Sequence, residues 1–197
     1  MLKNTLIRNN IRLCMRRLRN TLTHYEQKKA ALEISEKIFK YDFINKVNNV
    51  GLFLSFDGEI DTQPLILKLW NKNINIYMPV LDLLDTKNLL FMQYTATTQL
   101  KLNKLNIFEP INIIENSISI DQLDVIFIPL VAFNKKGYRL GMGGGFYDRI
   151  LKNWKENHFL PIGLAHNFQF ISFFPIFSWD IPLPFIVTPK KIWNSHF

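Results

Sequence analysis

The sequence lacks the features of a secreted, disulfide-bonded or membrane-spanning protein. Cys14 is the single cysteine among 197 residues, which excludes an internal disulfide and indicates a reducing compartment. The N-terminus alternates arginine with apolar residues and has no apolar core of a secretory signal. The longest apolar run, 125–133, is interrupted by Pro129 and is too short to span a bilayer. We therefore expect a cytoplasmic protein with no membrane partner.

Acidic residues are scarce, above all near the N-terminus. Lys and Arg number 24 against 16 Asp and Glu, a formal net charge of +8, and no acid precedes Glu26. Excess cations can mark a nucleic-acid partner, but scattered lysines are more often a solvated face, and most of this excess is scattered. We do not expect nucleic acid as a partner. Without an internal repeat or linker, residues 1–197 are expected to form one domain and a monomer.

The first twenty residues carry the one organised group of charges and predict a basic helix. Apolar side chains recur at helical spacing, and arginines recur beside them. Two interpretations stay open: a solvated basic face, or a face on which the arginines nearest the apolar edge reach a phosphate or carboxylate. We expect Arg16 and Arg19 to lie on the surface. The apolar stripe is Ile7, Ile11, Cys14, Met15 and Leu18, and the basic stripe is Arg8, Arg12, Arg16 and Arg19.

Beyond this helix, strand-like and helix-like segments alternate. Helices are predicted at 23–39, which opens on a capping box, from about 62 with Pro64 in the first turn, and at roughly 147–157. Strands are predicted at 50–56, 74–80, 89–94 as an antiparallel neighbour, 123–133, 161–166 and 185–188. This alternation predicts an α/β fold with a mostly parallel central sheet flanked by helices, together with the basic N-terminal helix.

Glycine is scarce as well, and half of it lies in one loop. The chain has eight glycines, of which four fall in RLGMGGGFYDR, residues 139–149. Glycine tolerates positive φ and lets the backbone approach a ligand, at an entropic cost in folding. The loop joins a predicted strand to a predicted helix, the position in which α/β sheets bind ligands. Its backbone N–H groups could hold an anion; a purely structural turn is the alternative.

The loop does not match the common phosphate-binding patterns. The chain has no GxxxxGK followed by Ser or Thr, and GMGGG is not GxGxxG. Arg139 and Arg149, with Lys135 and Lys136 nearby, supply positive charge. Asp148 is either a helix-start residue favoured by the helix dipole or an oxygen ligand for Mg²⁺. The composition leaves both interpretations open.

The longer segment GYRLGMGGGFYDR resembles the signature of the 5-formyltetrahydrofolate cyclo-ligase family (methenyltetrahydrofolate synthetases), with its Arg-Leu-Gly-x-Gly-x-Gly-x-Tyr-Asp core. The likeness extends over nearly the whole chain. It includes Ile7-Arg8 with the arginines that follow, FLSFDGEIDT (53–62), NIFEP (106–110), PLVAF (129–133) and IGLAHNFQ (162–169).

This resemblance implies an enzyme that uses ATP and Mg²⁺ to convert 5-formyltetrahydrofolate to 5,10-methenyltetrahydrofolate, with release of ADP and phosphate. ATP would phosphorylate the formyl oxygen, N10 would attack the activated carbon, and phosphate would leave. Such chemistry asks the protein mainly for positioning and charge neutralisation. Two alternatives are an RNA-binding protein on this scaffold and an ATP-using enzyme for another pterin or formyl compound.

The resemblance also implies the residues of the site. The catalytic residues would be Arg8 and Arg139, and the magnesium ligands Asp148 and Asp180. Phe56 and Asp61 would contact folate, although Phe56 as ordinary core is equally compatible with the sequence. The implied ATP-binding set is Asn4, Thr5, Leu6, Ile7, Arg8, Arg139, Leu140, Gly141, Met142, Gly143, Gly144, Gly145, Phe146 and Tyr147. The implied folate-binding set is Arg8, Phe56, Asp61, Met142, Gly143, Gly144, Gly145 and Phe146.

The chain departs from the family pattern at several positions. Asn4 stands where a lysine is usual, with Lys3 beside it. Near the C-terminus Asp180 is kept, but Trp179 and Pro184 replace polar neighbours, which weakens the expected surroundings of the metal. Two further departures are Asn106 for a common glycine and His166 for a common tyrosine.

Overall fold

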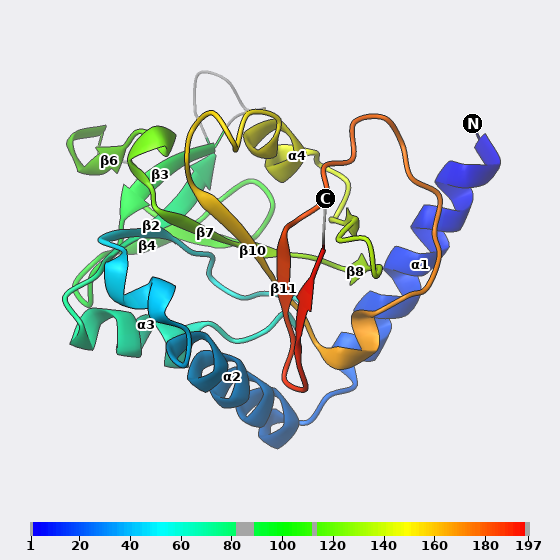
Figure 1. The fold of residues 1–197 in the computed structure, drawn as a ribbon, viewed down its shortest axis with the longest axis horizontal. Coiled ribbons are helices and arrows are strands. Elements are labelled where there is room, and N and C mark those ends of the chain that lie inside the picture. The colour runs from blue at the N-terminus through cyan, green and yellow to red at the C-terminus, as the bar shows by residue number, and fades with distance from the viewer. Residues whose placement is uncertain (1, 82–88, 112–113, 196–197) are drawn as a thin grey trace.

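An eight-stranded sheet forms the centre of the protein (Figure 1). The structure is a computed structural model that describes residues 2–81, 89–111 and 114–195. The strand order is β12-β11-β10-β7-β1-β2-β3-β6. The strands are β1 (Asn49–Gly51), β2 (Asn75–Leu81), β3 (Leu89–Gln93), β6 (Ser117–Ile118), β7 (Val125–Pro129), β10 (Leu160–Leu164), β11 (Phe185–Val187) and β12 (Ile192–Asn194).

The middle of the sheet is parallel and its margins are antiparallel. β11, β10, β7, β1 and β2 run parallel to one another, whereas β12, β3 and β6 pair antiparallel. The inner strands are almost entirely apolar, as expected for strands covered on both faces. The mostly parallel sheet is confirmed, as is the antiparallel neighbour predicted at 89–94.

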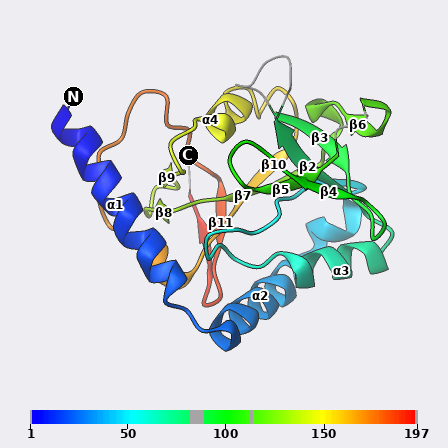
Figure 2. The same ribbon diagram turned by 180° about the vertical axis from the view of Figure 1, so that it is seen from behind.

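Helices cover both faces of this sheet. α2 (His24–Phe39) and α3 (Gln63–Asn71) bury their apolar sides in one core, while α4 (Phe146–Leu151) packs into a second core across the sheet. The capping box at Thr23 and Glu26 is present at the start of α2. Figure 2 shows the small hairpin of β4 (Leu100–Leu102) and β5 (Phe108–Pro110) beside β2.

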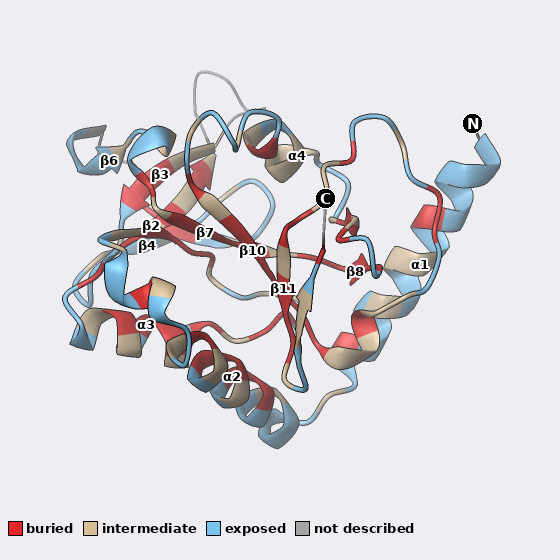
Figure 3. Ribbon diagram, viewed as in Figure 1, coloured by how far each residue is buried: buried red, intermediate tan, exposed pale blue. Residues whose placement is uncertain are grey.

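The N-terminal helix α1 (Leu2–Asn20) lies to one side of the sheet, against the hairpin of β8 (Ala132–Phe133) and β9 (Arg139–Leu140) (Figures 1 and 2). Its buried residues are Arg8 and Arg19, and Ile11 and Met15 pack on a small third core. Ile7, Cys14 and Leu18 of the predicted apolar stripe are exposed, and much of α1 is pale blue in Figure 3. The expectation of a surface position for Arg19 is therefore wrong.

Several predicted elements are shorter than their apolar runs. The run 50–56 is a strand only to Gly51, after which the chain leaves the sheet. The run 123–133 divides at Pro129 into β7 and β8, because Val131 pairs its N–H with the Leu140 carbonyl of the hairpin. The helix predicted at 147–157 is regular only to Leu151. In the two strand runs, residues such as Leu52, Phe53 and Leu130 stay buried after the strand has ended, which keeps the sequence apolar there.

No helix in the described part of the chain is long and apolar enough to cross a membrane. The single-domain, monomeric and cytoplasmic assignments stay predictions.

Candidate active site

A cavity of about 1090 Å³ opens at the carboxyl ends of β1, β2 and β7. From β1 the chain proceeds to β2 on one side, and later to β7 on the other, so the strand order reverses here. Ligands of open α/β sheets bind at this type of switch point. Its floor includes Phe53 and Glu59, which follow β1, and Leu130 and Val131, which follow β7.

Cationic side chains form one wall of the cavity, which we call the cation wall: Arg8, Arg12, Arg139, Arg149 and Lys152. Arg139 is buried, and its Nη2 lies 2.9 Å from Asp148 Oδ1 while its Nη1 donates to the Ile181 carbonyl at 2.9 Å. Burial lowers the Arg139 pKa, and the charge of Asp148 opposes that shift. Asp148 and the Ile181 carbonyl thus hold the guanidinium at the wall.

Arg8 is anchored on the same wall by the segment before β11. Its Nη2 donates to Asp180 Oδ1 at 2.8 Å, its Nη1 contacts Asp180 Oδ2, and Nη1 also donates to the Pro175 carbonyl at 3.1 Å. The guanidinium lies over the Phe177 ring, 4.6 Å from its centroid. A bidentate carboxylate pair fixes the direction of an arginine fork, so Arg8 is oriented in advance.

The glycine loop closes the cation wall with backbone that only glycine adopts readily. Gly143 has φ 110° and Gly145 has φ 70°, values that strain any residue with a Cβ. Arg12 Nε donates to the Gly141 carbonyl at 2.8 Å, and Arg149 Nη1 donates to the Gly144 carbonyl at 3.2 Å. Burial and the neighbouring Arg8 lower the Arg12 pKa. The loop is therefore held from α1 and from α4 in a conformation that faces the cavity.

The opposite side of the cavity is apolar and carries two buried carboxyl groups. Its apolar lining is Phe53, Leu54, Phe56, Met78, Pro79, Leu81, Leu89, Leu105, Ile107 and Phe108. Glu109 is already bonded, because its Oε2 accepts from the Asn103 amide at 2.9 Å and from the Leu81 N–H at 3.2 Å. Among the described residues Glu59 accepts one hydrogen bond, a long one of 3.4 Å from the Phe56 N–H, and burial raises its pKa to about 8. Glu59 therefore keeps capacity for a ligand.

Comparison with known proteins identifies the family to which the chain belongs. Residues 4–189 match the profile of the 5-formyltetrahydrofolate cyclo-ligase family. The chain belongs to this family. It is 43% identical over 180 residues to the 5-formyltetrahydrofolate cyclo-ligase of Escherichia coli strain K12, covering 91% of this chain and 99% of that protein. The Haemophilus influenzae protein of the same name is also 43% identical, covering 91% of this chain and 96% of its own.

A solved structure agrees with the family assignment. The Aquifex aeolicus 5,10-methenyltetrahydrofolate synthetase superposes with a TM-score of 0.81 at 26% identity, covering 97% of this chain and 94% of that one. The predicted family and the predicted fold class are therefore confirmed. The roles of individual residues in this cyclo-ligase family member stay predictions.

The cavity brings many of the residues predicted from the family resemblance together. Leu140 is buried just behind the wall, beside Arg139. Asn4, Thr5, Leu6 and Ile7 are exposed on the first turns of α1 and do not contribute to the cavity lining. The predicted residues that line the cavity are Arg8, Phe56, Arg139, Gly141, Met142, Gly143, Gly144, Gly145, Phe146, Tyr147 and Asp148.

Two predicted carboxylates have other neighbours than expected. Asp61 lies in a smaller adjoining cavity of about 440 Å³, and its Oδ1 accepts from the Gln63 N–H at 2.9 Å, where α3 begins. Asp180 is buried against Arg8, and its Oδ2 also accepts from the Phe177 N–H at 2.7 Å. Asp148 and Asp180 thus pair with different arginines rather than with each other.

Reasoning from the sequence missed Arg12 and Glu59. Arg12 belongs to the basic stripe that was identified, and it lies one helical turn after Arg8, so the spacing gave a usable signal. Glu59 lies in the same FLSFDGEIDT segment as Asp61, two residues earlier. The turn at Asp57 and Gly58, with φ of 49° and 70°, sets which of the two carboxyl groups faces the main cavity.

Proposed function

We propose that this protein catalyses the ATP-dependent cyclisation of 5-formyltetrahydrofolate to 5,10-methenyltetrahydrofolate. One observation carries the proposal: a single cavity joins a wall of arginines and glycine backbone to an apolar side with a buried carboxyl group. The first half suits a polyphosphate, and the second suits a flat ring with N–H groups on its edge. A reaction that transfers a phosphoryl group to a folate needs both ligands in contact.

ATP phosphates would lie along the cation wall. Arg8 and Arg139 present fixed guanidinium groups there, and arginine is well suited to phosphate because its planar fork donates in pairs. The backbone of Gly143 and Gly145 would approach the phosphates without a side chain in the way. Oriented charges stabilise a phosphoryl-transfer transition state without reorganising during the reaction.

Folate would fill the apolar side. Phe56 lies on that side and is half-buried, so it can cover a ring face. Glu59 is the buried carboxyl group with spare hydrogen-bonding capacity, and an ionised carboxylate accepts from the two neighbouring N–H groups on a pterin edge. We therefore propose Glu59, rather than Asp61, as the residue that binds the pterin, since Asp61 is used at the start of α3.

Mg²⁺ would neutralise charge on the ATP phosphates, and Asp148 fits it. Asp148 lies on the cavity wall with its side chain 27% exposed, and Mg²⁺ commonly takes one or two carboxylates plus phosphate oxygens. Asp180 fits less well, because both of its oxygens already accept from Arg8 or Phe177. Among the described residues no three His, Cys, Asp or Glu gather into a metal site. We propose that Asp148 binds the metal and that Asp180 holds Arg8.

The proposed reaction needs no covalent attachment to the protein. The formyl oxygen attacks the γ-phosphorus and ADP leaves. N10 then attacks the activated carbon and loses its proton to the phosphate group, and the C–O bond breaks to release phosphate. The cation wall holds the charge of the ATP and of the departing phosphate, while the apolar side keeps N10 in reach of the carbon and excludes water.

The test is the absorbance of methenyltetrahydrofolate formed from 5-formyltetrahydrofolate, with and without MgATP. We expect product only with MgATP. Tight ATP binding without product from this substrate would overturn the proposal in favour of another pterin or formyl compound.

A further inference from the structure

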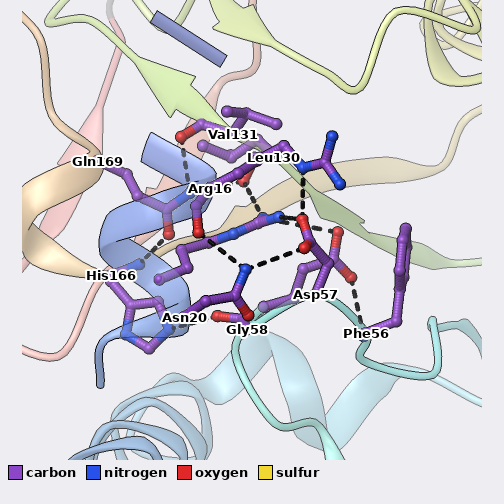
Figure 4. Close-up of polar contacts among 11 residues, drawn as sticks. Arg16, Asn20, Phe56, Asp57, Gly58, Leu130, Val131, His166 and Gln169 are labelled. Carbon is purple, nitrogen blue, oxygen red and sulfur yellow. Dashed lines mark hydrogen bonds and ion pairs between the residues drawn. The ribbon is translucent and has the colours of Figure 1, made fainter. Parts of the chain in front are cut away.

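Arg19 is a fully buried arginine that lies below the cavity rather than in it. Its side chain is 0% exposed, although it comes from the exposed helix α1. Its Nη2 contacts Asp57 Oδ2 at 2.7 Å, and its Nη1 donates to the Leu130 carbonyl at 3.5 Å and lies 3.8 Å from Glu59 Oε1 (Figure 4 shows the surrounding network). Arg19 thus links α1 to the two segments that form the cavity floor.

Stability alone does not account for this arginine. Its Nε is buried and has no hydrogen-bond partner among the described residues. A buried donor without a partner costs folding free energy, and replacing a buried ion pair with apolar side chains is often neutral or stabilising. Groups that break such rules are concentrated at functional sites.

The network around Arg19 fixes the turn that carries Glu59. A Cβ at Gly58 would lie 2.8 Å from Arg19 backbone and side-chain atoms, so the turn presses directly on α1. The Gly58 carbonyl lies 3.2 Å from His166 Nε2 on the far side of the turn. Gln169 Nε2 donates to the Leu130 and Val131 carbonyls at 2.6 and 2.9 Å (Figure 4). The position of Glu59 in the floor therefore depends on α1.

Glu59 is surrounded by charged and titratable groups from several elements. Arg19 faces it from α1, Asp57 from its own turn, and Tyr147 from α4. His166 faces Arg19 from the loop after β10. Burial of His166 lowers its pKa to about 4, so it adds no charge near neutral pH. Arg19 is thus the cation of this group that lies near Glu59, at 3.8 Å, and Asp57 is the anion whose charge acts on it.

We propose that Arg19 and Asp57 are positioning residues that set both the place and the charge of Glu59, and hence the affinity of the cavity for the pterin ring. This proposal rests on the proposed function, which places a folate pterin against Glu59. The two residues act in opposite directions. The Arg19 cation favours an ionised Glu59 carboxylate that can accept two N–H bonds, and the Asp57 anion disfavours it.

The electrostatics of the cluster agree with this geometry. Burial raises the Glu59 pKa most, Arg19 lowers it and Asp57 raises it, so that it stands at about 8. Burial raises the pKa of Asp57, but the bonds from Arg16, Asn20 and Arg19 outweigh that and leave it lowered. Asp57 is therefore ionised near neutral pH while much of Glu59 is protonated, and pterin binding should release a proton.

The test compares Arg19→Met with Asp57→Asn by titration calorimetry of 5-formyltetrahydrofolate binding across the pH window around 8. Affinity should rise with pH as Glu59 ionises. Arg19→Met should move this rise to higher pH, and Asp57→Asn, which keeps a residue type that tolerates positive φ, should move it to lower pH. A displacement of one pH unit changes affinity near neutral pH roughly tenfold. Arg19→Met should thus bind more weakly than wild type there, and Asp57→Asn more tightly.

Arg16→Met is the matched control. Arg16 Nε bonds the same Asp57 oxygen at 2.7 Å, but its side chain is 45% exposed and reaches Asp57 rather than Glu59. Its pH profile should stay within a few tenths of a unit of wild type, a small effect typical of surface ion pairs. Glu59→Gln should remove the pH dependence altogether.

If both variants have a lower melting temperature while their pH profiles fail to move in opposite directions, the proposal is overturned. The cluster would then have only a structural role. If Arg19→Met does not fold, a profile of Asp57→Asn that is unmoved or moved upward overturns it alone. Turnover of the wild type decides the proposed function separately. If the wild type binds the folate without turnover, the proposed function is overturned, and the pH profiles still decide the roles of Arg19 and Asp57. If the wild type does not bind the folate, both proposals are overturned.

Discussion

The two sides of the cavity hold charge in opposite ways. On the cation wall, Arg8 and Arg139 are each matched by one carboxylate and remain in the cavity lining. On the apolar side, Glu59 is buried with its nearest cation, Arg19, placed behind it at 3.8 Å. The first arrangement presents positive charge to a ligand, and the second keeps a carboxyl group near its point of ionisation.

Under the proposed function, this difference would let one cavity bind two unlike ligands, each on its own side. A polyphosphate is repelled from an apolar floor with a carboxyl group, and a pterin edge finds no acceptor among the arginines. In the proposed reaction, the formyl group and the γ-phosphate would meet where the two sides join. Each of the following variants, the controls aside, alters one side of the cavity and leaves the other intact.

The largest effect is expected from Arg139→Met. Removing this buried guanidinium takes positive charge from the wall and leaves Asp148 without its partner. We expect turnover to fall by roughly 10²–10³-fold, as for loss of one oriented donor to a transition state. Steady-state assays at saturating folate measure it. Lys152→Met, which removes an exposed cation from the same wall, should change turnover only a few-fold; equal losses in both would contradict the special position of Arg139.

Asp148→Asn and Asp180→Asn distinguish the proposed metal ligand, Asp148, from the residue proposed to fix Arg8, Asp180. Asp148→Asn should lower turnover by about 10–100-fold, the range seen on disturbing a metal site, and added Mg²⁺ should restore part of it. Asp180→Asn should raise the KM for ATP, because Arg8 loses its charged partner, and should leave the Mg²⁺ requirement unchanged. Mg²⁺ titrations at fixed ATP distinguish them. If the Asp180 variant needs more Mg²⁺, then Asp180 is a metal ligand and releases Arg8 on binding.

Glu59→Gln tests the opposite side of the cavity. An amide offers one acceptor and one donor in place of two acceptors, so it should raise the KM for 5-formyltetrahydrofolate by about 10–100-fold, equivalent to about 1.4–2.7 kcal/mol. Asp61→Asn is the matched control, because that carboxylate lies in the adjoining cavity. Initial rates at varied folate measure both. A larger effect at Asp61 than at Glu59 would restore the sequence-based prediction.

Gly143→Ala should have the smallest effect. The φ of 110° at Gly143 is costly for alanine, and the nearest atom to the new Cβ would be Arg12 Cζ at 4.0 Å, so the loss comes from the backbone. The strain should cost about 1–2 kcal/mol. If the loop changes its conformation to relieve this strain, ATP affinity should fall roughly ten-fold. Gly141→Ala, with no atom within 4 Å of its Cβ and no positive φ, should cost less. Calorimetric ATP binding and melting curves compare the two.

More of the fold than of the site could be predicted from the sequence. Alternating apolar segments gave the mostly parallel sheet, and the signature at 139–149 gave the family. The ends of the strands could not be read, because residues such as Phe53 and Leu130 stay buried after the chain has left the sheet. The apolar periodicity of α1 did not identify its buried face, which carries Arg8 and Arg19. The partners of these arginines lie more than 30 residues away in sequence, so local spacing could not reveal them.

The placement of carboxylates depended on the same long-range packing. Asp57, Glu59 and Asp61 alternate within one short segment, and spacing alone does not say which of them reaches the cavity. The left-handed turn at Asp57 and Gly58, pressed against α1, decides it. Asp180 was predicted from the resemblance as a magnesium ligand, and only the folded chain shows that Arg8 contacts both of its oxygens.

The division of the cavity between two ligands is tested most directly by measuring both KM values in two variants, Glu59→Gln and Arg12→Met. Arg12 supports the glycine loop through the Gly141 carbonyl and lies on the cation wall. We predict a crossed result: Glu59→Gln raises the KM for 5-formyltetrahydrofolate and spares that for ATP, whereas Arg12→Met does the reverse. If either variant raises both KM values equally, or if the pattern is inverted, the two sides of the cavity do not serve separate ligands.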